Sequence, residues 1–424
     1  MRPTFRASVY IVSLLIGVAG AFGCPSPLFA FEHTKVLPRG VRGLAVRTVD
    51  TRLSSKTDAS GTALPLGAPL EKDLTFARIV AGEEATKGKQ LQAFLMANGF
   101  SEEEAVGTFT ADLKGRVQVV APIASYGLTD SLTLALAVPY YRANTAVEVG
   151  FRQNERAAAF LAALASPEQN QIEAARDATS KLNNAVARLN AKLIENNYSA
   201  LEDWQAAGVG DVTLAAKYRV FDVGPVAGAF TGGVVAPTGR TDDPDILTDI
   251  PFGDGQWDAF GQVAFDQPIS HYIFINQFAK YTWQAPGRKS VRDVTDKESI
   301  EVKNISTRFK LGDKIDAGLS ANYLSPGGVV VGLGRTWFRK FGDRYEAAGS
   351  EGSIQDGEAR SQLSKNSDQF SEHNEFALGY STIPAFQRGK FPAPLEIKFG
   401  LQQQVRSRNM PVSDLAQIDA SLFF

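Results

Sequence analysis

Apolar and polar residues alternate at every second position along much of this chain. From Ala416 to Phe424 the alternate residues are apolar, and polar residues such as Asp419 stand between them. The same alternation runs through residues 211–220 and 395–402. Because successive side chains of a β-strand point to opposite faces, this pattern predicts strands with one apolar face and one polar face.

Twelve segments of this kind are expected to be strands. They cover residues 38–52, 110–126, 131–147, 208–221, 226–239, 257–269, 272–285, 312–325, 329–342, 368–382, 393–406 and 413–424. The connections alternate between short turns, such as residues 127–130, and long segments, such as residues 148–207. Outer-membrane β-barrels have an even number of strands, tight periplasmic turns and long external loops. The pattern therefore predicts an all-β fold, a transmembrane antiparallel up-and-down barrel of about twelve strands with both termini periplasmic.

The membrane prediction has two further supports. Beyond its first residues the chain has no apolar stretch long enough for a helix to cross a bilayer, and a closed barrel satisfies its backbone N–H and C=O groups without water. Leu422 and Phe424, at the apolar end of the last strand, are expected to be the signal that the barrel-assembly machinery reads. The expected partners are this machinery and outer-membrane lipid, and the expected location is the outer membrane of a Gram-negative cell.

The first thirty residues have the pattern of a secretory signal peptide. Arg2 and Arg6 precede an apolar run that extends to Gly23, and cleavage is expected after Ala30. The barrel would then occupy residues 31–424. Cys24, the one cysteine of the chain, leaves with the signal in this interpretation; the alternative is a lipoprotein signal in which Cys24 carries the lipid.

Two of the long loops are expected to contain helices, over residues 80–106 and 153–200. In the second, Ser166 to Gln169 form a capping box. An apolar seam with helical spacing follows at Ile172, Ala175, Thr179, Leu182, Val186, Leu189 and Leu193. The seam serves either local packing, or a lid over the external mouth and partner docking.

Composition and scarce reactive residues argue against most other classes of protein. The 44 basic and 46 acidic residues are nearly balanced, so there is no basic surface for nucleic acid. Of the three histidines, His33 and His271 are not expected near a cleft, and only His373 has a serine and an asparagine close in sequence. A membrane hydrolase is therefore a weak third hypothesis, and we expect neither an enzyme nor a cofactor.

Several carboxylates gather in the loop that spans residues 240–254. Asp242, Asp243 and Asp245 are the weak candidates for a divalent cation site, because such ions prefer oxygen ligands. Their spacing does not match a known calcium loop. A solvated or cross-bridged acidic loop is the alternative, and we expect no metal.

The polar faces of the predicted strands would line the barrel lumen. The candidates are Asp211, Lys217, Arg219, Asp258, Asp266, Lys280, Asp316, Arg335, Glu375, Glu396, Lys398 and Asp419. Because charges of both signs are mixed, no strong ion filter is expected. The set is either a salt-bridged interior that stabilises the barrel or the polar lining of a solute path. An inward Arg335 would place Val330, Gly332, Gly334, Thr336 and Phe338 outside.

Three stretches resemble a known family. Residues 126–140, 208–219 and 233–239 are similar to the outer-membrane proteins named for the meta-pathway of phenol degradation. The likeness covers about a third of the chain and consists of strand–turn–strand patterns. It implies a transporter-like barrel for aromatic or other hydrophobic compounds.

Two functions remain open at this point. The leading hypothesis is passive uptake of small, hydrophobic or aromatic solutes through the barrel or laterally out of it. The alternative is a non-transport surface barrel, an adhesin or structural protein, whose helical loops bind a partner. The sequence names no solute.

Overall fold

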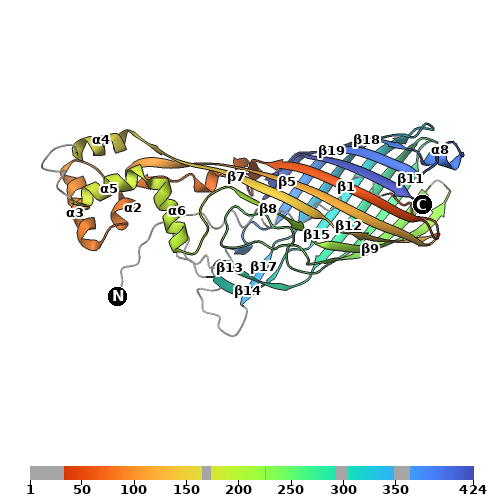
Figure 1. Ribbon diagram of the computed structural model, residues 1–424, viewed down its shortest axis with the longest axis horizontal. Coiled ribbons are helices and arrows are strands. Elements are labelled where there is room, and N and C mark those ends of the chain that lie inside the picture. Colours follow the sequence, from red (N-terminus) through yellow and green to blue (C-terminus); the bar gives the residue numbers. More distant parts are fainter. Residues whose placement is uncertain (1–32, 165–172, 225, 293–303, 348–362) are drawn as a thin grey trace.

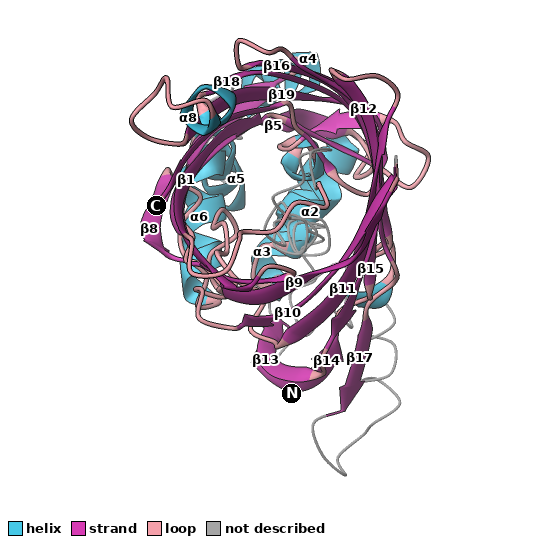
Figure 2. Ribbon diagram, turned by 90° about the vertical axis from the view of Figure 1, so that its right-hand side faces the viewer, coloured by secondary structure: helices cyan, strands magenta, loops and turns pink. Residues whose placement is uncertain are grey.

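Twelve antiparallel strands form a closed β-barrel, which Figure 2 shows in end view. The computed structural model describes residues 33–164, 173–224, 226–292, 304–347 and 363–424. The barrel strands are β1 (Arg42–Leu53), β5 (Ala105–Thr129), β6 (Leu132–Ala137) continued by β7 (Tyr140–Gln153), β8 (Trp204–Val209) continued by β9 (Val212–Val223), β10 (Val226–Ala236), β11 (Asp258–Pro268), β12 (Ile273–Gln284), β15 (Lys314–Leu324), β16 (Val329–Lys340), β18 (Gln369–Ser381), β19 (Leu395–Arg408) and β21 (Leu415–Phe423). The barrel closes because β1 pairs with both β21 and β5.

Every predicted strand overlaps one of these, and the expected fold class is confirmed. The outer face carries large apolar side chains at alternate positions, such as Leu214, Leu333 and Ile397, which are 53%, 60% and 58% exposed. Such a belt is unfavourable in water and is the surface that lipid requires. In β12, Tyr281 is exposed on the outer face and Phe278 is buried on the inner face.

The orientation of β16 is opposite to the one expected. Leu333 and Arg335 lie on the outer face, whereas Val330 and Thr336 are buried inside. The outward position of Arg335 is tolerated because its Nε donates to Glu372 on β18 at 2.8 Å. The rule that a charged side chain must point into the lumen fails where a neighbouring carboxylate neutralises it.

Two adjacent strands are interrupted at the same height of the wall. The break between β6 and β7 contains Pro139, which has no N–H for the ladder, and the break between β8 and β9 contains Gly210. The Gly210 N–H donates to the Pro139 carbonyl at 2.8 Å. A Cβ at Gly210 would lie 2.3 Å from the Tyr141 ring, so any other residue there would have to displace that ring.

The two ends of the barrel differ. One end has short connections, among them the turn that contains α8 (Ile383–Gln387), and we call it the short-turn end. At the opposite, long-loop end, β5 and β7 extend past the barrel to a helical body (Figure 1). The elements of this body are β4 (Asp73–Thr75), α2 (Phe76–Ala81), α3 (Ala85–Ala97), α4 (Glu155–Leu164) and α5 (Glu173–Asn183).

The helical body has its own apolar core. The Phe160 ring lies 5.1 Å from Phe76, 5.8 Å from Phe94 and 6.0 Å from Phe100, measured between centroids. Leu182, a member of the predicted seam, is buried in the same cluster. Both helical loops are therefore present, and Leu182 takes part in local packing. The proposed capping box at Ser166 lies outside the described residues, as does the predicted signal peptide.

Smaller elements complete the long-loop end. They are β2 (Ser55–Thr57), β3 (Ala63–Pro65), η2 (Ala68–Leu70), α6 (Ala185–Glu195), β13 (Gly287–Arg292), β14 (Asn304–Lys310), β17 (Arg344–Ala347) and β20 (Pro411–Val412). They form two small sheets, in which β14 pairs with both β13 and β17, and β2 pairs with both β20 and β3. Among the described helices, none is both long and apolar enough to span a membrane.

Candidate functional site

The interior of the barrel contains a cavity of about 860 Å³. Its wall is largely apolar on the side of β5 and β6, where Ile123, Ala135 and Ala137 point inward. The small side chains of Ala135 and Ala137 leave space that larger ones would fill. The aromatic rings of Tyr141 on β7 and Phe260 on β11 also line the cavity. The result is an apolar chamber, of the size that ligand pockets have.

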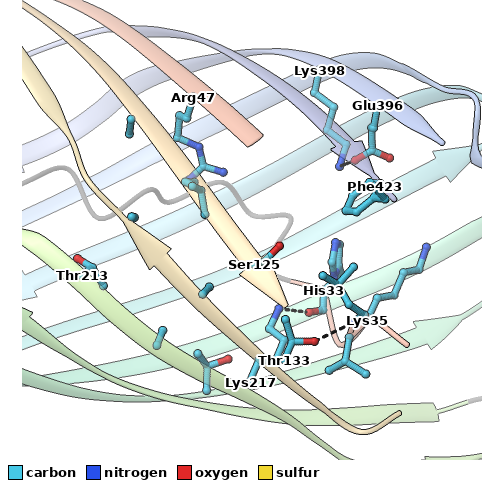
Figure 3. A pocket seen from close by; sticks show the side chains of 18 of the residues that line it. His33, Lys35, Arg47, Ser125, Thr133, Thr213, Lys217, Glu396, Lys398 and Phe423 are labelled. Atoms are coloured by element: carbon cyan, nitrogen blue, oxygen red, sulfur yellow. Dashed lines mark hydrogen bonds and ion pairs between the residues drawn. The ribbon is translucent and has the colours of Figure 1, made fainter. Parts of the chain in front are cut away.

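Residues 33–39, which we call the N-terminal segment, enter the barrel from the short-turn end and form one wall of the cavity (Figure 3). The main-chain N–H and the hydroxyl of Thr34 both donate to Asp266 Oδ2, at 2.8 and 2.7 Å. The Leu37 N–H donates to Thr133 Oγ1 at 2.7 Å. The segment is thus held by hydrogen bonds to two different parts of the barrel wall.

The opposite end of the cavity is covered by a loop from the long-loop end. Residues 237–257, here named the mouth loop, fold inward between β10 and β11, and Phe252 stacks on Tyr141 with ring centroids 5.2 Å apart. Asp211 accepts hydrogen bonds from the Gly239 and Asp254 main chain, at 2.8 and 3.4 Å. The mouth loop is therefore fastened beside the break between β8 and β9.

The charged residues of the cavity wall are unevenly divided between signs. Six basic residues contribute, Lys35, Arg47, Lys217, Arg219, Lys280 and Lys398. The two acidic residues are Asp211 and Glu396. Charges of both signs are present, as the sequence predicts, but basic residues outnumber acidic ones in the cavity wall. Other inner carboxylates, such as Asp266 and Glu375, lie outside this wall and bind protein groups.

The inner carboxylates that do not line the cavity are bound to other groups of the protein. Asp266 accepts from Thr34 and also from Asn276 Nδ2 at 2.8 Å. Glu375 accepts from Thr336 Oγ1 at 2.9 Å. Asp419 bonds Arg47 Nε at 2.7 Å. Each of these acids is committed to a protein partner, which leaves the basic side chains to dominate the cavity surface.

Three lysines from separate elements come together near His33. The Lys217 ammonium donates to the His33 carbonyl at 2.8 Å. Figure 3 shows Lys35 beside His33, and Lys398 above them, where it pairs with Glu396 at 2.6 Å. Burial, followed by the charges of Lys217, Lys35 and Lys398, holds the pKa of the His33 imidazole well below its ordinary value. The expectation that His33 is remote from any cleft was therefore wrong.

All but one of the predicted lumen residues face the interior. Asp211, Lys217, Arg219, Lys280, Glu396 and Lys398 line the cavity. Asp258, Asp266, Asp316 and Glu375 are buried inside, and Asp419 is held by Arg47. Arg335 is the exception, because it lies on the outer face. Leu422 and Phe424 are exposed there too, and their recognition by the assembly machinery stays a prediction.

The acidic mouth loop uses its carboxylates for internal bonds. Asp245 pairs with Arg292 at 2.6 Å and accepts from Asn304 at 3.0 Å. Asp249 pairs with Arg240 at 2.7 Å. In the described part of the chain, no group of three or more acidic, histidine or cysteine side chains is arranged to hold a metal ion. Asp242 and Asp243 contact Asp249 instead.

The weak hydrolase candidates do not form a site at the cavity. Ser371 is fully buried on β18, and His373 follows a bulge in the same strand. Neither of them lines the cavity. The sequence proximity of these two side chains therefore corresponds to no accessible nucleophile.

Comparison with solved structures shows the same fold in an outer-membrane channel. The chain is similar to an outer membrane channel from Pseudomonas putida F1, with 14% identity, a TM-score of 0.51, and coverage of 93% of this chain and 98% of the other. At this identity the likeness establishes the fold alone. The fold and the exposed apolar belt define a transmembrane β-barrel of the outer-membrane type.

Two further solved structures match with TM-scores too low to support an argument. They are a Pseudomonas aeruginosa FadL homologue (9% identity, TM-score 0.32, coverage 100% and 99%) and the Ralstonia pickettii toluene transporter TbuX (10%, 0.34, 91% and 89%). No protein-family model matches the chain. No curated protein matches it either.

Proposed function

We propose that the protein is a passive outer-membrane channel for small hydrophobic or aromatic solutes. The observation that carries this proposal is the apolar chamber of about 860 Å³ inside the barrel. Burial of an apolar solute there is favourable, since each square ångström removed from water contributes about 25 cal/mol. The outer membrane channel from Pseudomonas putida F1 has the same fold, which agrees with a channel.

A route into and out of the chamber follows from its boundaries. The mouth loop covers the cavity at the long-loop end, and the N-terminal segment lies at the short-turn end. A solute would enter when the mouth loop moves. It would leave past the N-terminal segment or sideways at the break beside Pro139, which lines the cavity. No covalent step is required.

Transport can be tested by blocking the chamber from within. Replacing Ala135, on the cavity wall, by tryptophan should fill the space and strongly reduce solute uptake into proteoliposomes. The matched control is Leu136→Trp, because Leu136 is the next residue of β6 and is 42% exposed on the lipid face. Equal uptake by both variants, or no uptake by the folded wild type above that of empty liposomes, would refute the proposal.

The helical body supports a second candidate function, binding of a surface partner. Its buried phenylalanine cluster gives it a defined shape beyond the barrel. If partner binding is the function, the wild type transports no solute and the Ala135→Trp variant still binds the partner. If the protein is a channel, the wild type transports solute and the Ala135→Trp variant does not.

A further inference from the structure

Three arginines gather on the outer face of the barrel, where β16, β18 and β19 reach the long-loop end. They are Arg339 near the end of β16, and Arg406 and Arg408 at the end of β19, and all three are exposed. Arg339 and Arg408 stand opposite the same residue of β18, Phe370, one on each side of it. We call the three arginines the arginine patch. It is separate from the cavity, which none of them lines.

Two of the three arginines form no ion pair with the described residues. The guanidinium groups of Arg339 and Arg406 lie near aromatic rings instead, 5.2 Å from the centroid of Phe341 and 5.9 Å from that of Phe370. Arg408 differs, because it pairs with Asp368 at 2.6 Å. The patch therefore offers two charged groups that another molecule can bind.

Glu372, the carboxylate of β18 that stands opposite Arg406, is used by other groups. Its Oε1 accepts hydrogen bonds from Arg335 Nε at 2.8 Å and from Trp337 Nε1 at 2.7 Å. Its charge also attracts Arg406, without an ion pair between the two. One carboxylate thus faces two arginines here, and the outer surface keeps an excess of positive charge.

The arginine patch begins where the apolar belt ends. Leu333 on β16 and Leu401 on β19 are 60% and 45% exposed on the same outer faces, nearer the short-turn end. Trp337 stands between Leu333 and Arg339 along β16, and aromatic residues flank the apolar band of such barrels at the membrane–water interface. Because the long loops of these barrels are external, this order puts the patch at the headgroup level of the outer leaflet.

We infer that the arginine patch binds the phosphorylated sugar headgroup of an outer-leaflet glycolipid of the lipid A type, whose acyl chains lie on the apolar belt. Arginine suits phosphate because its planar guanidinium can donate two parallel hydrogen bonds. A soluble anion would contact the arginines alone, whereas the lipid also covers Leu333 and Leu401.

The spacing of the two unpaired arginines fits a headgroup with two phosphates. Arg339 and Arg406 belong to strands on either side of β18, and their partners on that strand, Phe370 and Glu372, are two residues apart. Strand geometry therefore separates the two arginines by about 10 Å across the sheet and about 7 Å along it. Their long side chains can reach two phosphates on one sugar headgroup.

The inference is tested by binding of two lipids that differ in one phosphate. The probes are diphosphoryl lipid A and monophosphoryl lipid A with the same acyl chains, and native mass spectrometry of the full chain released from detergent micelles measures the lipid bound. Wild-type protein should bind the diphosphoryl form about fivefold more tightly, because a basic residue near a membrane surface contributes about that factor. Equal affinities would overturn the inference.

Variants connect the preference to the patch. Arg339→Gln and Arg406→Gln should each weaken binding of diphosphoryl lipid A about fivefold, and the double variant should lose the preference for it. Arg339→Lys, which keeps the charge, should retain the preference. Arg388→Gln is the control, because Arg388 is exposed at the short-turn end, where it donates to the Pro326 carbonyl.

Two further outcomes would count against the inference. Arg339 and Arg406 are exposed, so both variants should fold, as the heat-induced mobility shift on gels can verify. A preference for diphosphoryl lipid A that persists in the folded double variant would overturn the assignment of these arginines. If wild-type protein binds phosphatidylglycerol as tightly as diphosphoryl lipid A, the patch attracts any anionic lipid, and the glycolipid site is refuted.

Discussion

The rings of Tyr141 and Phe252 stack with their centroids 5.2 Å apart and an angle of 12° between their planes. Tyr141 belongs to the barrel wall and Phe252 to the mouth loop, so this contact connects the loop to the cavity that it covers. Both side chains are almost fully buried. The mouth loop is therefore packed in place, and its opening requires that these rings separate.

Replacing Phe252 by alanine should favour the open mouth. Truncation of a buried phenylalanine costs about 3–5 kcal/mol, and here that cost falls on the closed position of the loop. We expect larger single-channel conductance in planar bilayers, with a barrel that still folds. Phe399→Ala is the control, because Phe399 is exposed on the lipid face of β19. Unchanged conductance in the folded Phe252→Ala variant would show that the loop does not close the channel.

The same loop should respond to pH through Asp249. Burial, then the charge of Asp242, raises the pKa of Asp249 from 3.8 to about 8. Arg240, 2.7 Å away, and the hydrogen bond from the Asp243 N–H act to lower the pKa of Asp249. Lys289 on β13 acts to lower the pKa of Asp242. Between these two pKa values, Asp249 holds a proton in the closed loop, whereas a solvated carboxyl has lost its proton.

Between about pH 4 and about pH 8 the closed loop thus binds more protons than the open loop, so rising pH through this window disfavours closure. Open probability in planar bilayers should increase over that range and level off above it. Asp249→Asn should remove this part of the pH dependence, because the amide is neutral throughout. Asp112→Asn, at an exposed position of β5, should leave it intact. If the Asp249→Asn variant keeps the wild-type pH response, that response comes from other groups.

The N-terminal segment should be loosened by Thr34→Val. Valine keeps the shape and removes the hydroxyl that donates to Asp266 at 2.7 Å, a bond to a charged acceptor worth about 2 kcal/mol. Hydrogen–deuterium exchange of the amides in residues 33–39 should become faster, and conductance should rise. Thr62→Val, in an exposed turn, is the control. Identical exchange in the two variants would mean that the Asp266 contact does not hold the segment.

The twelve strands could be predicted because a period of two depends on neighbouring residues alone. Ile418 faces lipid and Gln417 the interior, as the alternation in β21 requires. Arg335 was misplaced because its orientation depends on Glu372 across the sheet, and no local pattern reports that contact. The strands and the barrel that they form could be predicted from the sequence, whereas the side of β16 that faces the lumen could not.

The cavity could be predicted only in part. Lys217 and Lys398 were placed in the lumen by alternation, but Lys35 and His33 belong to no strand. Their position depends on Thr34 reaching Asp266, a residue 232 positions away along the chain. The inward fold of the mouth loop depends in the same way on Phe252 meeting Tyr141. Contacts of such separation leave no periodic signal in the sequence.

The paired breaks in the wall provide the sharpest stability prediction. Gly210 lies where β8 ends, and an added Cβ would stand 2.3 Å from Tyr141 Cε2 and 2.9 Å from the Phe252 carbonyl oxygen. Gly210→Ala must therefore push Tyr141 or the mouth loop aside. We expect a loss of about 1–3 kcal/mol in barrel stability, measured as a lower temperature for the heat-induced mobility shift on gels.

Gly208→Ala is a closely matched control for that variant. Gly208 lies two residues earlier, within β8, and its added Cβ would make an ordinary contact of 3.6 Å with the Phe252 ring. It should leave the transition temperature nearly unchanged. If Gly210→Ala is as stable as Gly208→Ala, the wall at the break yields easily, and a sideways route for solute at Pro139 becomes the better explanation of how the cavity empties. If only Gly210→Ala is destabilised, the break is a tightly packed joint and the N-terminal segment is the exit.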